Sequence, residues 1–329
     1  RRIRLQSQFE LANRKEANAL RAKAIDAESD LLPRLHALWG LGQLKARDRD
    51  LLKLLCQDKD AEVRAQAIRW AGELGFDPDN IVPGLLGDPS PRVRSMAGIA
   101  CGKLKSKDAL GPLTELIVEA ANKETVLRHA GICGLAGAVT PSELKKLSKH
   151  SSEALRIAAV VALRRQRAFE EVAAFLEDAS PQVMSDAARA LYDEASGETF
   201  TARPDLLAAL ANCLHPSRPA PVNFRAIAAN RRLGTIEAAR RVAAFLVTPK
   251  LDPALRVEAL YSLESWPDAS TLDPMDGRHF PVSQGDPDVL GAVVGPEVWS
   301  LANDSNDKVS RRVIALLRKI EPSSAQLDR

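Results

Sequence analysis

Aromatic residues are scarce in this chain of 329 residues, at 4%, and the net charge is only +3. A nucleic-acid-binding groove needs a marked basic surplus, so this composition argues against one. No apolar run approaches the length of about 18 residues that a membrane span requires. The sequence therefore predicts neither a nucleic-acid partner nor a membrane span.

Cysteine is also sparse, and catalytic motifs are missing. No Cys-x-x-Cys pair, Gly-rich phosphate loop, His-Glu-x-x-His or Gly-x-Ser-x-Gly occurs. All four cysteines lie in apolar helical contexts, where a free thiol behaves as a small hydrophobe, so we predict that they are buried. They are Cys56, Cys101, Cys133 and Cys213. The sequence thus predicts no disulfide, no metal, no cofactor and no catalytic residue.

What the sequence does contain is a recurring segment. "EVRAQAIRWAGEL" at 62–74 returns as "RVRSMAGIACGKL" at 92–104 and as "ALRVEALYSLESW" at 254–266. The residue before the arginine is apolar, the third after it is small, and the seventh is usually apolar, which places one stripe on a helix. Self-similarity with a period of about 30 residues indicates a solenoid, in which stacking of the units makes the core.

Each of these helices follows a short, Asp-rich break, such as 58–62 or 88–92, which predicts a turn and a helix cap. Another apolar helix precedes the break, as at 49–57. The unit is therefore helix, turn, helix, and it resembles the HEAT repeat. This resemblance implies an all-α solenoid of about nine to ten HEAT-like repeats, forming a single array over residues 1–329.

An arginine recurs at the start of the second helix of most units. We interpret this column as an internal ladder, in which each planar guanidinium bonds aspartates or carbonyls of adjacent turns, and not as a phosphate-binding stripe. The predicted ladder consists of Arg34, Arg64, Arg94, Arg128, Arg156, Arg225 and Arg256. Two units depart from it, with Met184 and Ser310 at the arginine position.

The repeat is interrupted in two regions, and insertions in solenoids often mark a binding face. The spacing stretches between 184 and 224, and a long loop insertion at 265–288 precedes the last repeat. The candidate binding residues of this loop are Asp276, Arg278, His279 and Phe280, close to Asp273. The loop lacks the alternating carboxylates of a calcium site, so we favour a clamp between the last repeats or a docking segment for a neighbouring domain.

The exposed side of the second helices offers further candidates for binding. His36 and Trp39 occupy such positions, and Arg69 lies one repeat after Trp39. An aromatic ring beside a cation is typical of an interface hot spot. Packing of Trp39 beneath the first helices is the alternative reading, and the sequence does not decide between the two.

The amino-acid sequences of several repeats resemble those of one particular group of proteins. "RLHALWGLGQL" at 34–44, "LRHAGICGL" at 127–135 and "FRAIAANRRLG" at 224–234 are similar to the HEAT region of large exported proteins of planctomycetes and verrucomicrobia. Those proteins join a propeller resembling sugar dehydrogenases to a HEAT solenoid and then to a c-type cytochrome module. The resemblance implies an extracytoplasmic or periplasmic middle segment. A start at Arg1, inside a second helix, agrees with a piece of a larger protein.

These observations favour a non-catalytic scaffold that binds a protein or neighbouring domains of the same polypeptide. A HEAT-like DNA glycosylase of the alkylpurine type is one alternative, and it would require a basic groove with aromatics and a carboxylate. A bilin-lyase-like HEAT protein that handles a tetrapyrrole chromophore is the other. Salt-dependent binding of duplex DNA would favour the first alternative, and binding of a pigment the second.

Overall fold

The computed structural model describes residues 2–195, 204–273, 275, 277–282, 285–286 and 288–320, without the side chains of 194–195, 204 and 279–282. Helices dominate these residues, and they form helix–turn–helix repeats, so the predicted all-α, HEAT-like solenoid class is confirmed. The chain divides into two compact units, the first unit Arg1–Ala168 and the second unit Phe169–Arg329. Each is described by itself.

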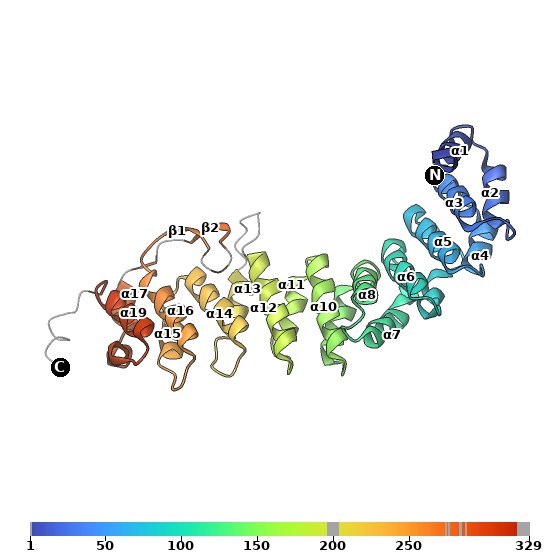
Figure 1. Cartoon of the computed structure of the whole chain (residues 1–329). Helices are drawn as coiled ribbons and strands as arrows, with labels where there is room; N and C mark the ends of the chain where they lie inside the picture. Colours follow the sequence, from blue (N-terminus) through green and yellow to red (C-terminus); the bar gives the residue numbers. More distant parts are fainter. Residues whose placement is uncertain are drawn as a thin grey trace. The chain divides into compact units, whose positions relative to one another are not determined.

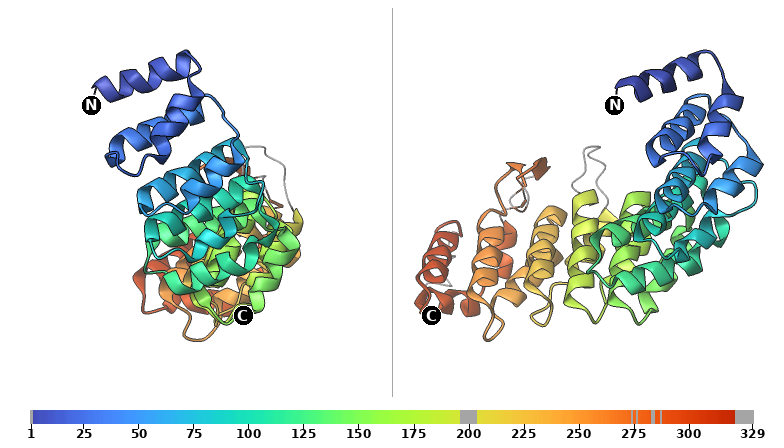
Figure 2. Two further views of the ribbon diagram at one scale, coloured as in Figure 1. Left: turned by 90° about the vertical axis from the view of Figure 1, so that its right-hand side faces the viewer. Right: turned by 45° about the vertical axis from the view of Figure 1, so that its right-hand side comes forward.

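The described residues of the first unit form five helix pairs and one preceding helix. The preceding helix is α1 (Arg2–Asn13), and the pairs are α2 (Ala17–Ile25) with α3 (Leu31–Gln43), α4 (Arg49–Cys56) with α5 (Ala61–Leu74), the 3-10 helix η1 (Val82–Gly87) with α6 (Pro91–Leu104), α7 (Leu110–Ala120) with α8 (Thr125–Ala138), and α9 (Pro141–Lys146) with α10 (Glu153–Gln166). Helices α1, α3, α5, α6, α8 and α10 pack on one another in that order and form one layer, as Figure 2 shows for α1, α3 and α5. The first helices of the pairs form the other layer.

The described residues of the second unit form four further pairs. These are α11 (Phe169–Val172) with α12 (Pro181–Ala195), α13 (Pro204–Ala211) with α14 (Ala220–Leu233), α15 (Ile236–Leu246) with α16 (Pro253–Glu264), and α18 (Pro296–Ser300) with α19 (Asp307–Leu317). Between α16 and α18 lie an antiparallel hairpin, β1 (Ser270–Leu272) and β2 (His279–Val282), and the short helix α17 (Asp288–Val293). Figure 1 shows the hairpin beside α14 and α16.

The capping and core columns of the repeat explain why these segments are helical. Asp60 caps α5 by accepting hydrogen bonds from the backbone N–H groups of Glu62 and Val63, as expected for the break at 58–62. The apolar positions beside the arginines are buried, for example Val63 and Val93. The apolar stripe of each second helix therefore faces the core between the two layers.

Small residues let α6 and α8 approach with backbones in contact. A Cβ on Gly137 would lie 2.2 Å from the carbonyl oxygen of Gly102, and a Cβ on Gly102 would lie 2.4 Å from that of Cys133. No side chain larger than hydrogen fits at either position without moving a helix. Cys133 itself is half-buried, so the prediction of four buried thiols is wrong for this cysteine and holds for the other three. The repeat places Cys133 on the outward side of α8, which its apolar neighbours in sequence did not reveal.

The insertion at 265–288 is attached to the helices of the second unit through a buried aspartate. The Asp273 side chain is 1% exposed. Its carboxylate accepts a 2.7 Å hydrogen bond from the Tyr192 hydroxyl and forms an ion pair with Arg232, whose guanidinium lies 4.2 Å from the centre of the Tyr192 ring. Because Tyr192 belongs to α12 and Arg232 to α14, the insertion contacts two repeats at once.

The insertion also closes on the helix that it leaves. The backbone N–H of Gly285 donates a 3.0 Å hydrogen bond to the carbonyl of Trp266, whose side chain is fully buried. The sequence predicted a loop without regular structure here, and strands β1 and β2 correct that prediction. Segments of three and four residues are too short to show the alternation by which strands are recognised.

Candidate functional site: a groove on the second helices

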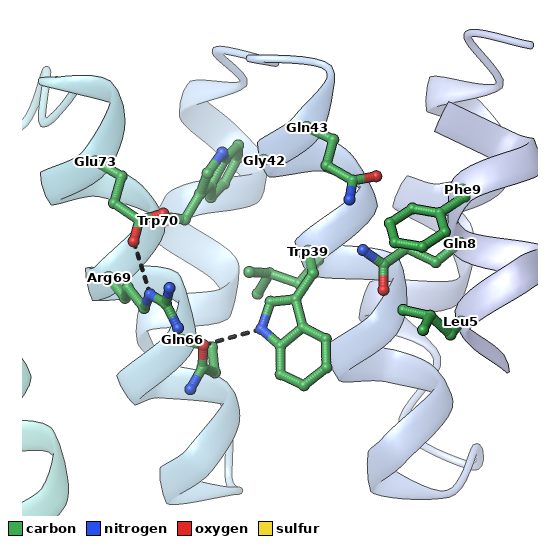
Figure 3. A pocket seen from close by; sticks show the side chains of 11 residues that line it. Leu5, Gln8, Phe9, Trp39, Gly42, Gln43, Gln66, Arg69, Trp70 and Glu73 are labelled. Atoms are coloured by element: carbon green, nitrogen blue, oxygen red, sulfur yellow. Dashed lines mark hydrogen bonds and ion pairs between the residues drawn. The ribbon is translucent and has the colours of Figure 1, made fainter. Parts of the chain in front are cut away.

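Two adjoining hollows cross the layer of second helices in the first unit. The aromatic hollow has a volume of about 540 Å³ and lies over α1, α3 and α5 (Figure 3). It is lined by Leu5, Gln8, Phe9, Leu38, Trp39, Gly42, Gln43, Gln66, Arg69, Trp70 and Glu73. The basic hollow, of about 300 Å³, lies over α5 and α6 and is lined by Arg69, Gly72, Glu73, Arg92, Met96, Ile99, Ala100 and Lys103. Arg69 and Glu73 border both, so the hollows together make one groove across four helices.

The repeat itself aligns the side chains of this groove. Phe9, Trp39, Arg69 and Ile99 are each 30 residues from the next and occupy the same position of successive repeats. Equivalent positions of stacked helices lie side by side, and the groove therefore runs across the helices and not along one of them. Figure 3 shows Trp39 between the side chains contributed by α1 and those contributed by α5.

A chain of hydrogen bonds fixes the indole of Trp39. Its Nε1–H donates to Oε1 of Gln66 at 3.0 Å, and Nε2 of Gln66 donates to Oε1 of Glu62 at 2.7 Å. Arg92 of α6 reaches the other oxygen of Glu62 at 3.2 Å. Burial alone would raise the pKa of Glu62, but the hydrogen bonds from Arg92 and Gln66 outweigh it and lower the pKa. Glu62 is therefore ionised at neutral pH and links the two hollows.

His36 holds the other side of the same indole. The two rings meet edge to face, with their centres 5.0 Å apart and their planes at 72°. Nδ1 of His36 lies 2.7 Å from Oε1 of the buried Gln8, so this nitrogen carries the hydrogen. Burial, reinforced by the charge of Arg4, lowers the pKa of His36. The imidazole is therefore neutral at pH 7 and serves as a fixed, polar support for Trp39.

Arg69 borders the groove as an exposed ion pair. Its Nε lies 2.7 Å from Oε1 of Glu73, one turn further along α5, and the two side chains are 53% and 47% exposed. The three residues predicted on the second-helix face, His36, Trp39 and Arg69, thus come together at one place. The guanidinium pairs with Glu73 and makes no ring contact with Trp39 within the described residues.

The arginine column lies near the start of the second helices, and none of its arginines lines the groove. Arg64 forms two 2.9 Å hydrogen bonds to the carboxylate of Asp88 and a 2.8 Å bond to the carbonyl of Asp58. Arg34 pairs in the same way with Asp58 and donates to the carbonyl of Ala24 at 3.0 Å. Burial would raise the pKa of Asp58 and Asp88, but hydrogen bonds from Arg34 and Arg64 and from backbone N–H groups lower both.

The remaining arginines of the column show how far this pattern extends. Arg256 repeats it across the insertion, with 2.9 Å to Asp304 and 3.0 Å to the carbonyl of Thr248. Other contacts are those of Arg94 to Glu119 at 2.7 Å, Arg156 to the carbonyls of His150 and Ser151, and Arg225 to the carbonyl of Pro221 in its own helix. Arg128 is half-buried, and its side chain forms no hydrogen bond or ion pair with another described residue. The stabilising role of the column stays a prediction.

A residue from outside the column occupies the place that Met184 leaves open. Arg218, in the turn before α14, donates to the carbonyl of Leu176 at 2.8 Å and pairs with Glu177. Its Nη1 also lies 3.2 Å from the sulfur of Met184. The sequence did not reveal that Arg218 takes the place of a column arginine, because Arg218 is 34 positions away from Met184 and belongs to no repeat column.

Of the candidate residues in the 265–288 insertion, only Arg278 has a described side chain. Arg278 is exposed, Asp276 lies outside the described residues, and so do the side chains of His279 and Phe280, although the backbone of both belongs to β2. Within the part of the chain that the structure describes, no three His, Cys, Asp or Glu side chains gather as a metal site would require. Burial raises the pKa of the Cys56 and Cys101 thiols to about 12, so neither supplies a thiolate at neutral pH.

Among the described residues, no helix combines the length and apolar character that crossing a bilayer demands. The sequence model of HEAT repeats matches residues 49–135, which correspond to α4 through α8. No curated protein matches the sequence. The match thus covers part of the first unit and includes α5 and α6 of the groove.

Several solved structures are similar to this chain at low sequence identity. The karyopherin Kap121p, in a mutant form, is 12% identical with a TM-score of 0.53, over 96% of this chain and 39% of that chain. Human deoxyhypusine hydroxylase is 17% identical with a TM-score of 0.30, over 94% and 98% of the two chains. The CpcE–CpcF complex of phycocyanin lyase from Nostoc is 18% identical with a TM-score of 0.31, over 92% and 94%. The likeness to Kap121p shows a shared helical-repeat fold.

Proposed function

We propose that this chain is a non-catalytic helical-repeat scaffold that binds a segment of a protein in the groove over α1, α3, α5 and α6. The network from His36 through Trp39 and Gln66 to Glu62 carries this proposal. It holds an aromatic ring rigidly at the border of a hollow, which is how interface hot spots are built. The HEAT-like fold supports the same reading, since Kap121p structures include complexes with Nup53p and with the extreme C-terminus of Cdc14p.

The parent protein is part of the proposal. We infer that residues 1–329 form one array, which is the middle segment of an exported redox protein and spaces or orients its neighbouring modules. The support is the resemblance of segments such as 34–44 and 127–135 to the HEAT region of such proteins. Sequencing the gene on both sides of this chain tests it. A propeller before and a Cys-x-x-Cys-His module after the array are expected, and flanks without either contradict it.

Selection of peptides on the intact chain tests the binding function. Random 12-residue peptides displayed on phage are selected against the full chain and then measured against Trp39→Ala. Tyr261→Ala, which removes a partly exposed aromatic ring of the second unit, is the matched control. We expect the selected peptides to lose at least about tenfold in affinity on Trp39→Ala and little on Tyr261→Ala. Failure to select any peptide, or equal binding to both variants, contradicts the proposal.

A further inference from the structure

We propose that the segment bound in the groove is acidic and carries an aromatic or leucine anchor. This inference rests on the proposed function and adds the chemistry of the partner. Its basis is the unequal lining of the two hollows. One offers apolar rings, and the other has three cations, of which Arg69 pairs with Glu73, Arg92 pairs with Glu62, and Lys103 has no ion pair with a described residue.

The cations of the basic hollow are available to a partner. The Arg69–Glu73 and Arg92–Glu62 pairs are solvent-exposed, with side chains 32% to 53% exposed. Exposed pairs are weak, so carboxylates of a ligand can compete for the same guanidinium groups. Lys103 is exposed and forms no ion pair with any described residue, which leaves its charge uncompensated beside the groove. A partner with clustered carboxylates complements this hollow, and a basic partner does not.

The lining of the aromatic hollow favours a ligand with an apolar side chain as its anchor. Phe9 and Leu5 of α1 are 45% and 41% exposed at its border. The indole N–H of Trp39 is already bonded to Gln66, so Trp39 offers a ligand its apolar ring and not its donor. The side chain of Gln43 is exposed and makes no hydrogen bond to another described residue, so its amide can bond the backbone of an extended peptide.

The repeat also sets the spacing between anchor and charge. Packed helices lie about 8–10 Å apart, and an extended peptide advances about 3.3 Å per residue. Three residues therefore span one helix-to-helix step. A ligand with its anchor over α3 needs its carboxylates about three to six residues away to reach Arg69, Arg92 and Lys103.

Designed peptides test this chemistry by calorimetric titration of the full chain. One peptide is Gly-Ser-Phe-Gly-Gly-Asp-Glu-Asp-Gly-Ser, and the second has the same residues in reverse order, because the direction of the chain in the groove is open. Matched peptides carry Asn and Gln, or Lys, in place of the three acids, or Gly in place of Phe. We expect one acidic order to bind at least about tenfold more tightly than its neutral, basic and Phe-less counterparts.

Two substitutions locate the binding. Lys103→Glu reverses a charge in the basic hollow, and Lys107→Glu reverses an exposed charge outside it on the following 3-10 helix. We expect Lys103→Glu to weaken the acidic peptide about tenfold or more and Lys107→Glu to change it less than twofold. Phe9→Ala removes a half-exposed ring that contributes little to the core, and so tests whether the hollow binds the apolar anchor. Circular dichroism checks that each variant is folded.

The outcomes separate this inference from the proposed function. If neutral or basic peptides bind as tightly as acidic ones, and Phe9→Ala weakens their binding, the inference of an acidic partner is wrong and binding in the groove still holds. Acidic peptides that bind equally to Lys103→Glu and Lys107→Glu overturn it as well. If no designed peptide binds while phage selection yields Trp39-dependent peptides, the chemistry is wrong and the function stands. Failure of both experiments removes both proposals.

Discussion

The two units of this chain are built from the same kind of repeat, but different contacts link the repeats within each unit. In the first unit, adjacent repeats are linked by arginine–aspartate pairs at nearly constant sequence distance, such as Arg34 with Asp58 and Arg64 with Asp88. In the second unit, Arg256 and Asp304 form such a pair across 48 positions, and Tyr192 and Arg232 also meet Asp273 of an insertion, 81 and 41 positions away. The regular unit thus leaves its layer of second helices free for a groove, whereas the interrupted unit uses its inserted segment as a clamp.

The largest effect is expected from removing the clamp. Asp273→Ala removes the carboxylate that pairs with the buried side chain of Arg232, and breaking a buried pair in this way costs about 3–5 kcal/mol. Urea denaturation monitored by circular dichroism should show the loss. Asp286→Asn, at an exposed position of the same insertion, is the control and should change stability by less than about 0.5 kcal/mol. Equal effects of the two substitutions would show that the insertion is only loosely attached.

A second comparison concerns the arginine column. Arg34→Ala removes a buried partner of Asp58 and of a backbone carbonyl, and we expect a loss of about 3 kcal/mol. Arg225→Ala removes one bond to a carbonyl of the same helix, so a loss nearer to about 1 kcal/mol is expected. Denaturation of both variants measures the difference. Similar losses would mean that the column acts through helix packing and not through its links between repeats.

Close helix packing gives the next prediction. Gly137→Ala places a methyl group against the backbone of Gly102, and overpacking of this kind costs about 1–3 kcal/mol. Gly111→Ala, in α7, meets no atom within 4 Å and should be neutral or stabilise the chain by up to about 1 kcal/mol. Thermal unfolding of the pair distinguishes a steric effect from a general intolerance of alanine. A stable Gly137→Ala variant would show that α6 and α8 can separate.

The smallest effect is a dependence on acid pH. The pKa of Asp58 and of Asp88 lies below its ordinary value in the folded chain, so their stabilisation is complete above about pH 4 and is lost as pH falls through the lowered values. Unfolding free energies measured from pH 6 down to pH 2 should therefore decrease. Asp58→Asn should weaken that decrease, and an unchanged slope in this variant would exclude Asp58 as a contributor.

Much of the fold could be predicted from the sequence because the repeats share one pattern of buried, small and capping positions. The position of Trp39 and Arg69 on one face followed from the same register. The hydrogen bonds that Glu62 accepts from Gln66 and Arg92 were missed, although Glu62 and Arg92 lie one repeat of 30 positions apart. Side-chain rotamers decide which of these partners meet, and the sequence does not show them. The burial of Asp273 could not be predicted, since its partners are distant in sequence and the segment around it obeys no period.

Hydrogen exchange on the full chain, with and without the acidic phenylalanine peptide, tests the central claim most directly. The account predicts slower exchange of backbone amides in α1, α3, α5 and α6 when the peptide is bound, and unchanged exchange in the described parts of the 265–288 insertion. Slower exchange in the insertion with no change in the first unit would contradict it, and would place binding at the clamp instead of the groove.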